Sequence, residues 1–328
     1  MLRFAMVLIA SLLLTGFQAA PPQIPPQIVL LLDDVRAARS FDYMAFKDGG
    51  ADLKSAIDAI HMRARNDGGG RRCLTVAEAE AQANLDAART ALDTAAFEAD
   101  RAAAAAAWTR WTAFSDGVLA GEPVADPPFS YVAQRVREAA DATDPLAQDL
   151  LRRTARDQLL RRGWDVTGEV WSEPPTPGAK SRLTNRIWQD TCRVDSENTA
   201  WLKAHVAAHG WIRISDYGEA ASGAAWLLVQ HADRDPTFQA EILALLEPLV
   251  AAKETSGGNY AYLYDRVAVG ANRPQRYGTQ GRCTAKDVWE PNDLEEPDRV
   301  EALRAAADIG SLAEYQAHMS SYCADFTG

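Results

Sequence analysis

Several well-known signatures are missing from this 328-residue sequence, and each absence excludes a class of protein. There is no phosphate loop of the GxxxxGK(S/T) type, no GxGxxG after a strand, and no GxSxG, HExxH, EF-hand or kinase motif. Basic residues are also few, because 34 Lys and Arg stand against 45 Asp and Glu, for a net charge of −11. Nucleic-acid binders need a basic surface. We therefore expect no nucleic-acid partner, and the sequence indicates no cofactor.

Beyond its N-terminus the sequence also lacks any apolar segment of the about 20 residues that a membrane-spanning helix needs. The one apolar run, residues 4–14, follows Arg3 and precedes the small residues Ala19 and Ala20. A charge, a short apolar run and small residues in this order are typical of a signal peptide. We therefore expect residues 1–20 to be removed and the protein to be exported, periplasmic or secreted, without a stable membrane anchor. An uncleaved anchor helix is the alternative.

Cysteine is scarce as well, with four residues in the whole chain. An even number in an exported protein favours disulfides, because exported compartments are oxidising. Of the three pairings, we favour Cys283 with Cys323 and Cys73 with Cys192, which keeps one bridge within the C-terminal region. No CxxC or CxH spacing supports zinc, and no metal site is predicted. A catalytic cysteine is the other alternative.

Helix signals dominate what is present, and they predict a mainly α protein, an irregular helical bundle. We expect a helical N-terminal extension over residues 21–140 and a C-terminal helical domain over 148–325 that carries a polar loop or short hairpin. The extension should contain one long helix. It starts at a capping box from Thr75 to Glu78, and the alanine-rich sequence that follows carries it to about Leu119.

Aspartate–proline pairs mark two later helix starts. Asp144-Pro145 predicts a helix that ends at Gly163, and Asp235-Pro236 predicts one that Pro248 should kink or end early. Between them, the proline-rich segment 172–180 is the clearest interruption, either a linker or a long loop. Further helices are expected at 218–232, 259–269, 297–309 and 311–322, with a short extended connection at 211–217 and a loop or hairpin at 272–283.

Polar groups able to do chemistry are concentrated between Ala225 and Gln280, among large apolar residues. His231 lies on the apolar face of its predicted helix, so its ring should point inward. It is either a core histidine with hydrogen-bond partners or a general acid or base that Asp233 or Asp265 orients, and these three are the candidate catalytic residues. His231 and Asp233 could also hold a metal, but two ligands are a weak signal.

The same segment supplies candidate ligand-binding groups. Arg266 suits the grip of a carboxylate or phosphate through two parallel hydrogen bonds, with a structural ion pair as the alternative. The sequence PQRYGTQ, residues 274–280, predicts either a binding loop or a hydrogen-bonded turn that holds the last helices in place. The predicted binding residues are Gln230, Arg266, Tyr277, Thr279 and Gln280, with Trp211 and Trp226 as aromatic walls.

An acidic and a basic residue also stand four positions apart in an earlier predicted helix. Asp157 and Arg161 are expected to pair on the helix surface. Gln158 falls on the same side as Leu151 and Ala155, which is unusual for an exposed helix. We include none of these residues in the predicted site.

Several segments together resemble one family. They are DQxxR (157–161), WLKxxxxxHGW (201–211), AWLLVQHADRDPTFQ (225–239), NYAYLYDRV (259–267), PQRYGTQ (274–280) and SLAEY (311–315). The chain from about residue 148 to 320 is similar to the bacterial proteins grouped as domain of unknown function 6624, which implies a shared domain and no particular reaction. One departure is Ile212, where the family often has Pro. The other is an insertion after Gln280 that carries Cys283, which favours a structural role for that cysteine.

Three functions remain open from the sequence. The first is a small-ligand binding domain with a polar cleft, and the second is an acid–base hydrolase that uses His231 with an aspartate. The third is a helical interaction module in which the polar groups only brace the fold. The sequence decides neither whether the protein is an enzyme nor which protein partner it has. A concave pocket that holds a His–Asp pair within hydrogen-bond reach would favour the enzyme, and we expect most of the polar set to lie in one cluster.

Overall fold

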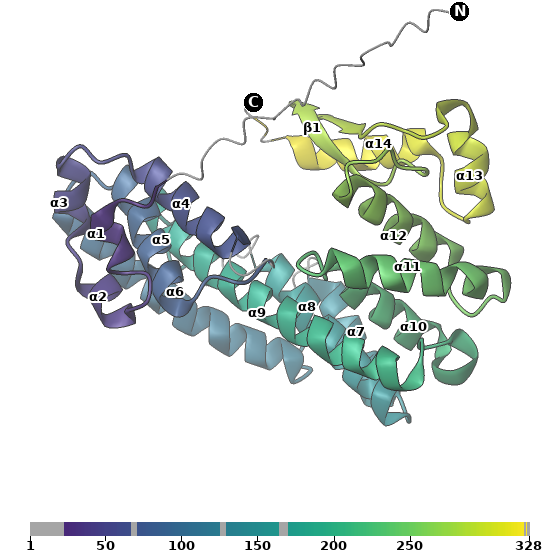
Figure 1. Ribbon diagram of the computed structural model, residues 1–328. Helices are drawn as coiled ribbons and strands as arrows, with labels where there is room; N and C mark the ends of the chain where they lie inside the picture. The colour runs from purple at the N-terminus through teal and green to yellow at the C-terminus, as the bar shows by residue number, and fades with distance from the viewer. Residues whose placement is uncertain (1–22, 67–70, 125–128, 164–169, 325, 327–328) are drawn as a thin grey trace, which may run out of the picture.

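The computed structural model describes residues 23–66, 71–124, 129–163, 170–324 and 326 (Figure 1). Over these residues the chain is mainly helical, as expected, and a two-stranded sheet is the one sheet that they form. The predicted signal peptide lies outside the described residues. Within the described ranges, no helix has the length and apolar character needed to cross a membrane.

The N-terminal helices build a hydrophobic core of their own. Tyr43, Ile60, Leu85 and Phe97 are buried in it, each from a different helix. These helices are α1 (Pro26–Val29), α2 (Val35–Ser40), α3 (Tyr43–Asp48), α4 (Leu53–Asn66), α5 (Val76–Thr90) and α6 (Thr94–Leu119). The core sits at one end of the molecule, the purple and blue part of Figure 1.

The expected capping box is present, but the prediction that it starts a single long helix is wrong. Thr75 accepts a hydrogen bond from the amide of Glu78 at 3.2 Å, and the Glu78 carboxylate accepts one from the Thr75 amide at 2.8 Å. The helix ends after 15 residues, and α6 begins anew with Asp93 as N-cap, which accepts from the amide of Ala96 at 2.8 Å. Because Asp satisfies amides that a helix start leaves free, it can break a run that alanine propensity alone would continue.

The longest helix, α9 (Pro177–His209), connects the two ends of the molecule. Its 33 residues span roughly 50 Å at the rise of an α-helix. It packs against α5 and α6 on one side, and against α8 (Pro145–Arg162) and α10 (Ile214–Gln230) further along. The expected interruption at 172–180 is shorter than predicted, because Thr176 caps α9 and Pro177 is its first residue.

Buried residues between α6, α8 and α9 form a second core that crosses the expected boundary near residue 140. Trp111 from α6, Leu159 from α8 and Ile187 from α9 are all buried there. The short helix α7 (Ser130–Asp141) packs along α8. Asp144 caps α8 as expected, accepting hydrogen bonds from the amides of Leu146 and Ala147.

The C-terminal half follows the aspartate–proline prediction, with two differences. No strand forms at 211–217, since α10 already starts at Ile214 and is interrupted at Gly218, whose φ is 83°. Pro248 does not end α11 (Pro236–Ala251) early. Pro248 lies on the exposed side of the helix, where the carbonyl that loses its hydrogen bond can turn towards water.

The chain ends in a hairpin and short helices that pack on α12 (Gly257–Gly270). The hairpin pairs β1 (Gly281–Ala285) with β2 (Val288–Pro291) in antiparallel register, so it comes later than the predicted loop at 272–283. The remaining elements are η3 (Pro297–Arg299), α13 (Val300–Ala306), α14 (Leu312–Ser320) and η4 (Ser321–Cys323). Figure 1 shows them together at the green and yellow end of the molecule.

The four cysteines pair as the sequence favoured. Cys73 and Cys192 form one disulfide, with 5.8 Å between their Cα atoms. Cys283 and Cys323 form the other, with 5.6 Å between their Cα atoms. The first joins the segment before α5 to the middle of α9, and the second joins β1 to the end of the chain. No cysteine among the described residues is free for catalysis.

Candidate functional site

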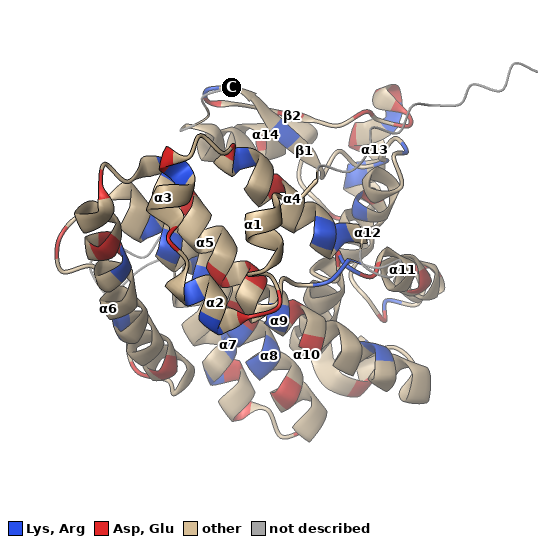
Figure 2. Cartoon of the chain, turned by 60° about the vertical axis from the view of Figure 1, so that its left-hand side comes forward, with Lys and Arg blue, Asp and Glu red and all other residues tan. Residues whose placement is uncertain are grey.

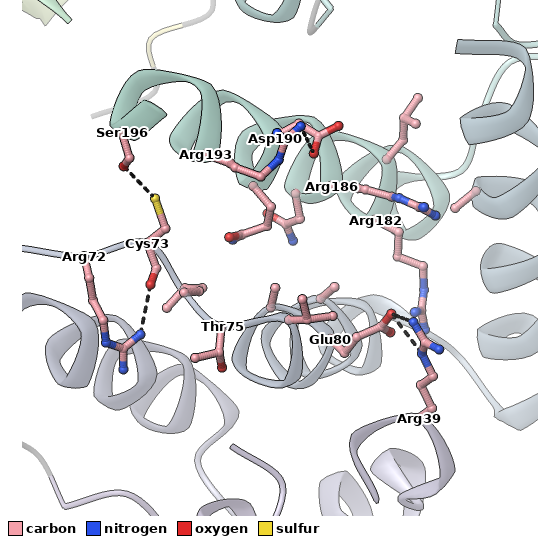
Figure 3. Close-up of a pocket in the computed structure, with 18 of the residues that line it drawn as sticks. Arg39, Arg72, Cys73, Thr75, Glu80, Arg182, Arg186, Asp190, Arg193 and Ser196 are labelled. Carbon is pink, nitrogen blue, oxygen red and sulfur yellow. Dashed lines mark hydrogen bonds and ion pairs between the residues drawn. The ribbon is translucent and has the colours of Figure 1, made fainter. Parts of the chain in front are cut away.

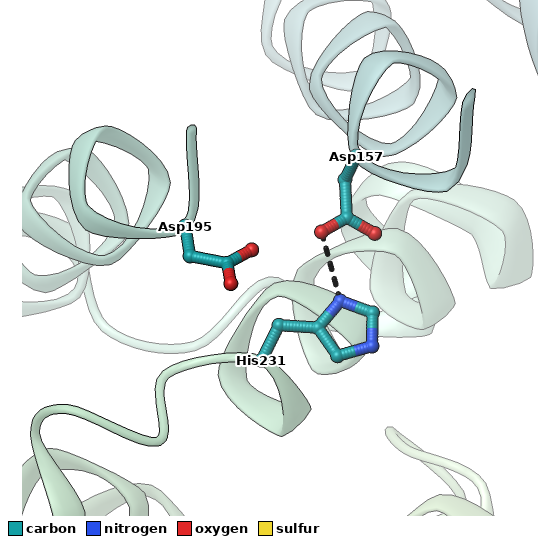
Figure 4. A group of neighbouring side chains, drawn as sticks. All are labelled: Asp157, Asp195 and His231. Carbon is teal, nitrogen blue, oxygen red and sulfur yellow. Dashed lines mark hydrogen bonds and ion pairs between the residues drawn. The ribbon is translucent and has the colours of Figure 1, made fainter. Parts of the chain in front are cut away.

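Three helices bring together the side chains of Asp157, Asp195 and His231 (Figure 4). Asp157 lies on α8, Asp195 on α9, and His231 is the residue directly after the last turn of α10. Their ligand atoms all lie within 4.8 Å of one another. Both aspartates are buried, and the imidazole is 16 % exposed, so the group lies just beneath the surface.

The closest contact in this group joins the histidine to the first aspartate. Nδ1 of His231 lies 2.9 Å from Oδ1 of Asp157. An ionised carboxylate can only accept a hydrogen bond, so the proton of this bond belongs to Nδ1. The neutral ring then carries a lone pair on Nε2. Figure 4 shows that nitrogen turned away from both carboxylates, and no residue among those described bonds to it.

Arg161 lies between the two aspartates and joins them. Its Nε is 3.3 Å from Oδ1 of Asp157, and its Nη2 is 2.7 Å from Oδ1 of Asp195. Nε of Arg161 is also 3.2 Å from Nδ1 of His231. With the proton on Nδ1, this N–H is directed to the Asp157 carboxylate. Gln158 completes the shell of Asp157 by donating to its other oxygen at 2.8 Å.

The two aspartates differ in how readily they hold a proton. Burial raises the pKa of Asp195 to about 7, with Arg161 acting in the opposite direction and Asp157 adding to the rise. Burial of Asp157 also favours its protonated form, but the hydrogen bond from His231 and the nearby positive charges hold the pKa of that carboxyl below its ordinary value. Two neighbouring carboxyls whose pKa values are pushed apart are the usual basis of paired acid and base roles.

A cavity of about 270 Å³ opens beside this group. His231 and Asp195 both line it, together with the cationic residues Arg234 and Lys203. Nη1 of Arg234 is 4.0 Å from Oδ2 of Asp195, and Nζ of Lys203 is 2.6 Å from the carboxylate of Asp235. This volume lies just below the range of about 300–1,000 Å³ that is usual for ligand pockets, so only a small molecule would fit.

The same three side chains are a possible ligand set for a metal ion, since imidazole and carboxylate bind several divalent metals. Arg161 already occupies the position between them, because its guanidinium donates to both Asp157 and Asp195. A metal would therefore have to displace the half-buried guanidinium of Arg161. The donor set fits an acid–base group better than a metal centre.

The predicted catalytic partner Asp233 lies in a different contact. Arg266 donates to both of its oxygens, at 2.8 and 2.7 Å, which is the structural ion pair that the sequence left open. Gln239 donates to the same carboxylate at 3.2 Å. The Asp233 side chain is 53 % exposed. Arg266 therefore has its two-pronged donor face engaged by the protein itself.

The other predicted catalytic residue, Asp265, holds the loop 274–280 instead of His231. It is fully buried and accepts hydrogen bonds from the amides of Arg276, Tyr277 and Thr279, and from the Thr279 hydroxyl. All four distances lie between 2.8 and 3.0 Å. The neighbouring residue Gln280 is fixed through its amide, which donates to the side chain of buried Gln275. The loop is therefore the hydrogen-bonded turn that was the alternative to a binding loop.

The predicted aromatic walls and Gln230 lie in the core of the C-terminal half. Trp211 and Gln230 are buried, and Trp226 packs edge-on against Tyr262. None of the three lines the cavity beside His231. Much of the predicted polar set, namely Asp265, Tyr277, Thr279 and Gln280, thus lies in one loop network. Arg266 and His231 lie outside that network, in the ion pair with Asp233 and in the histidine group.

Sequence reasoning did not assign Asp157, Arg161 and Asp195 to the site. Asp157 and Arg161 do pair, as expected for residues four apart, but Asp157 is 1 % exposed and so is not on the surface. The inward position of Gln158 was the one available sign that this helix face is buried. Asp195 has no distinguishing local pattern, because it is one of several acidic residues along α9.

Comparison with known proteins identifies a family whose function is unknown. A family model described as a family of unknown function (DUF6624) matches residues 144–323, more than half of the chain. This confirms the resemblance noted in the sequence. No curated protein and no solved structure matches the chain. The matched span contains α8, α9 and α10, and so all residues of the histidine group.

Proposed function

Because the chain belongs to the family of unknown function DUF6624, we propose an activity from the geometry of its described residues. We propose that the protein is an acid–base hydrolase of small substrates. In this proposal His231 is the general base, Asp157 orients it, and Asp195 is the acid. The cavity of about 270 Å³ beside them receives the substrate.

One observation carries this proposal. A buried carboxylate, Asp157, accepts a hydrogen bond from Nδ1 of a histidine that lines a cavity. A carboxylate in this position fixes the tautomer and the orientation of the ring, leaving Nε2 as a base. A histidine that only fills a core needs no adjoining cavity.

The proposed reaction is the hydrolysis of an ester by water. Nε2 of His231 takes a proton from water while the water oxygen forms a bond to the acyl carbon. Asp195, which is protonated in part of the molecules near pH 7 because burial raises its pKa to about 7, gives its proton to the departing oxygen as the ester bond breaks. The proton on His231 is then released to solvent, and Asp195 regains one from it.

The charges around the cavity favour an acidic substrate. Arg234 and Lys203 line the same space as His231. Lys203 is held by Asp235 at 2.6 Å, whereas the one ion pair of Arg234 within the described ranges is a long contact of 4.0 Å to Asp195. Arg234 is therefore the better placed cation for a carboxylate or phosphate on the substrate.

The two other functions considered from the sequence have less support. Anion binding by Arg266 competes with the two hydrogen bonds that this residue already donates to Asp233. A purely bracing role describes Asp265 well, but it gives no reason for a cavity beside His231. The acid–base proposal uses both the contact and the cavity.

The test is a comparison of turnover in matched variants. A panel of chromogenic esters, amides and phosphate monoesters, each in neutral and acidic forms, is offered to the wild type, His231→Gln, Asp157→Asn and Arg266→Gln. Loss of general-base catalysis should reduce ester turnover about 10²- to 10⁴-fold in His231→Gln. Asp157→Asn should also lose activity, while Arg266→Gln should retain it because it lies outside the group. Thermal unfolding of each variant shows whether it is folded.

A second measurement does not depend on the choice of substrate. Nitrogen-15 NMR of the histidine rings should find the neutral form of His231 protonated on Nδ1, and Asp157→Asn should change that tautomer balance. A proton on Nε2 in the wild type, or full ester turnover by His231→Gln, would rule out the proposal. Activity abolished by a chelator and restored by a divalent metal would replace it with metal-assisted chemistry.

A further inference from the structure

A second and much larger cavity lies beside the N-terminal helices, and Ser196 on α9 lines both this cavity and the one beside His231. Its volume is about 970 Å³, and it opens between α5 with its preceding segment, α6 and α9 (Figure 3). One part of its wall comes from the N-terminal helices, outside the span of the family match, and the other part comes from α9, inside that span. The disulfide residue Cys73 forms part of its wall.

The cavity is rich in arginine although the protein is acidic. Figure 2 shows acidic and basic residues interspersed over the helices rather than gathered by sign, and the net charge is −11. Seven arginines nevertheless line this cavity, against three carboxylates. Some of these arginines form ion pairs with neighbouring carboxylates. Arg39 pairs with Glu80 at 3.0 Å, and Arg193 pairs with Glu197 at 2.8 Å.

Arg182, which lines the cavity, is buried with part of its donor capacity unused. The side chain is 8 % exposed, donates through Nη1 to Asn84, and lies with its guanidinium 4.5 Å from the centre of the Phe97 ring. Its Nε and Nη2 have no hydrogen-bond partner among the described residues. A buried guanidinium with unpaired N–H groups is costly, so such a group points to a partner that binds there.

Arg186 stands one turn further along α9 and is more accessible. Its guanidinium lies 3.9 Å from the centre of the Trp108 ring. No carboxylate among the described residues lies within ion-pair distance of it. Stacking on an aromatic ring fixes the plane of a guanidinium while its N–H edge stays free to bind an anion. In Figure 3, Arg182 and Arg186 both extend from α9 near the same end of the cavity.

Much of the remaining wall is apolar, although Thr75, Asn185, Gln189 and Ser196 also line it. Leu74, Val76 and Leu183 line it together with short alanine side chains, and Val76 is 63 % exposed although it is a large apolar residue. Exposed apolar surface beside unpaired cations matches a ligand that has both characters. We propose that this cavity binds an amphipathic organic anion. Arg182 and Arg186 hold its carboxylate or phosphate head, and the apolar wall holds its hydrocarbon body.

The experiment is calorimetric titration of the full-length mature protein with four probes that stay monomeric at the concentrations used. Decanoate and decyl phosphate carry the two possible heads, decanol carries the body alone, and inorganic phosphate carries the head alone. At least one of the two amphipathic anions should bind, and the tighter of them identifies the head. Arg186→Gln should weaken that binding roughly tenfold or more, as the loss of a charge-assisted contact does.

Arg137→Gln is the matched control, because Arg137 is an exposed arginine on α7 that does not line the cavity. It should bind as the wild type does. The proposal is overturned if neither amphipathic anion binds, if decanol binds as tightly as the anions, or if inorganic phosphate alone binds as tightly as decyl phosphate. Wild-type affinity in Arg186→Gln would also overturn it. None of these results depends on the activity proposed for His231.

Discussion

Nδ1 of His231 lies 2.9 Å from a carboxylate oxygen of Asp157, although 74 residues separate the two in the chain. Asp233, only two residues from the histidine, is bound to Arg266 instead. The contact depends on the packing of α10 against α8. A buried carboxylate keeps its charge only where donors compensate for lost water, and His231, Arg161 and Gln158 are those donors for Asp157.

The stability of the protein should depend on pH through Asp195. Burial raises the pKa of this carboxyl to about 7, from an ordinary value of 3.8. Between these values the folded state holds a proton that the unfolded chain has released, so raising the pH through this window destabilises the folded state. Asp195→Asn cannot ionise and escapes this loss. Its stability relative to the wild type should rise by on the order of 1–3 kcal/mol from about pH 4 to about pH 7 and then level off.

Urea unfolding at several pH values checks this, with Asp190→Asn as the control. Asp190 lies on the same helix but pairs with Arg193 at 3.5 Å near the surface. The difference in the free energy of unfolding between Asp190→Asn and the wild type should change little with pH. If the stability of Asp195→Asn relative to the wild type stays constant or falls as the pH rises, the prediction is contradicted. Asp157→Asn should show the opposite sign, since a carboxyl with a lowered pKa stabilises the folded state above its ordinary pKa and loses that effect as the pH falls.

Removing the carboxylate of Asp265 should unfold the loop that it holds. Asp265→Ala leaves the amides of Arg276, Tyr277 and Thr279 without their acceptor in a buried place. At about 1–3 kcal/mol for each unsatisfied group, a loss of several kcal/mol is expected. Asp233→Ala is the comparison, because its pair with Arg266 is half exposed and should contribute only about 0–1 kcal/mol. Equal decreases in the melting temperatures of the two variants would contradict this assignment.

The two disulfides should differ in their effect on stability. The bridge Cys73–Cys192 closes a loop with a sequence separation of 119, and Cys283–Cys323 one of 40. If each acts mainly by restricting the unfolded chain, replacing the first pair by serine should cost about 1 kcal/mol more than replacing the second, from totals of about 5 and about 4 kcal/mol. Chemical denaturation of the two double variants measures the difference. Thiol labelling of the unreduced, denatured wild type should find no free cysteine.

Two glycines should respond in opposite ways to alanine. A Cβ at Gly178, in the first turn of α9, would overlap the carboxylate of Asp100, which is buried and bound to Thr176. Gly178→Ala should therefore destabilise the protein by about 1–3 kcal/mol. Gly223 lies inside α10 with open space at its Cβ position, so Gly223→Ala should stabilise it by about 0.5–1 kcal/mol. Thermal unfolding of both variants measures these two effects. A stabilised Gly178→Ala would show that α6 and α9 do not pack closely at Asp100 and Gly178.

Local signals in the sequence were sufficient for most helix starts. Thr75, Asp144 and Asp235 each cap a helix where predicted, because an N-cap needs only its own side chain and the next three amides. The same physics explains the error at Asp93, where a cap of equal quality was hidden in an alanine-rich run. Gly218 interrupts α10 with a positive φ. The helix after Gly218 was predicted, but the helical residues before it, from Ile214, were not.

The site was harder to predict, because its contacts join residues far apart in the chain. His231 was recognised from its place on an apolar face, which is a local property. Its partner was not, since Asp157 and Asp195 lie on two other helices and each looks like an ordinary charge on a helix surface. The ion pair of Arg266 and the turn held by Asp265 were both foreseen as alternatives. Choosing between the readings needed distances between side chains, which periodicity does not supply.

The bridge between Cys73 and Cys192 also changes what a break in the chain means. Cys192 lies inside the span matched by the family, and Cys73 lies in the N-terminal part outside it. A protease cut anywhere between them would leave two polypeptides that remain linked by the disulfide until a reductant breaks it. The N-terminal extension and the family domain would therefore stay covalently joined through the disulfide, even when the peptide bond between them is cleaved.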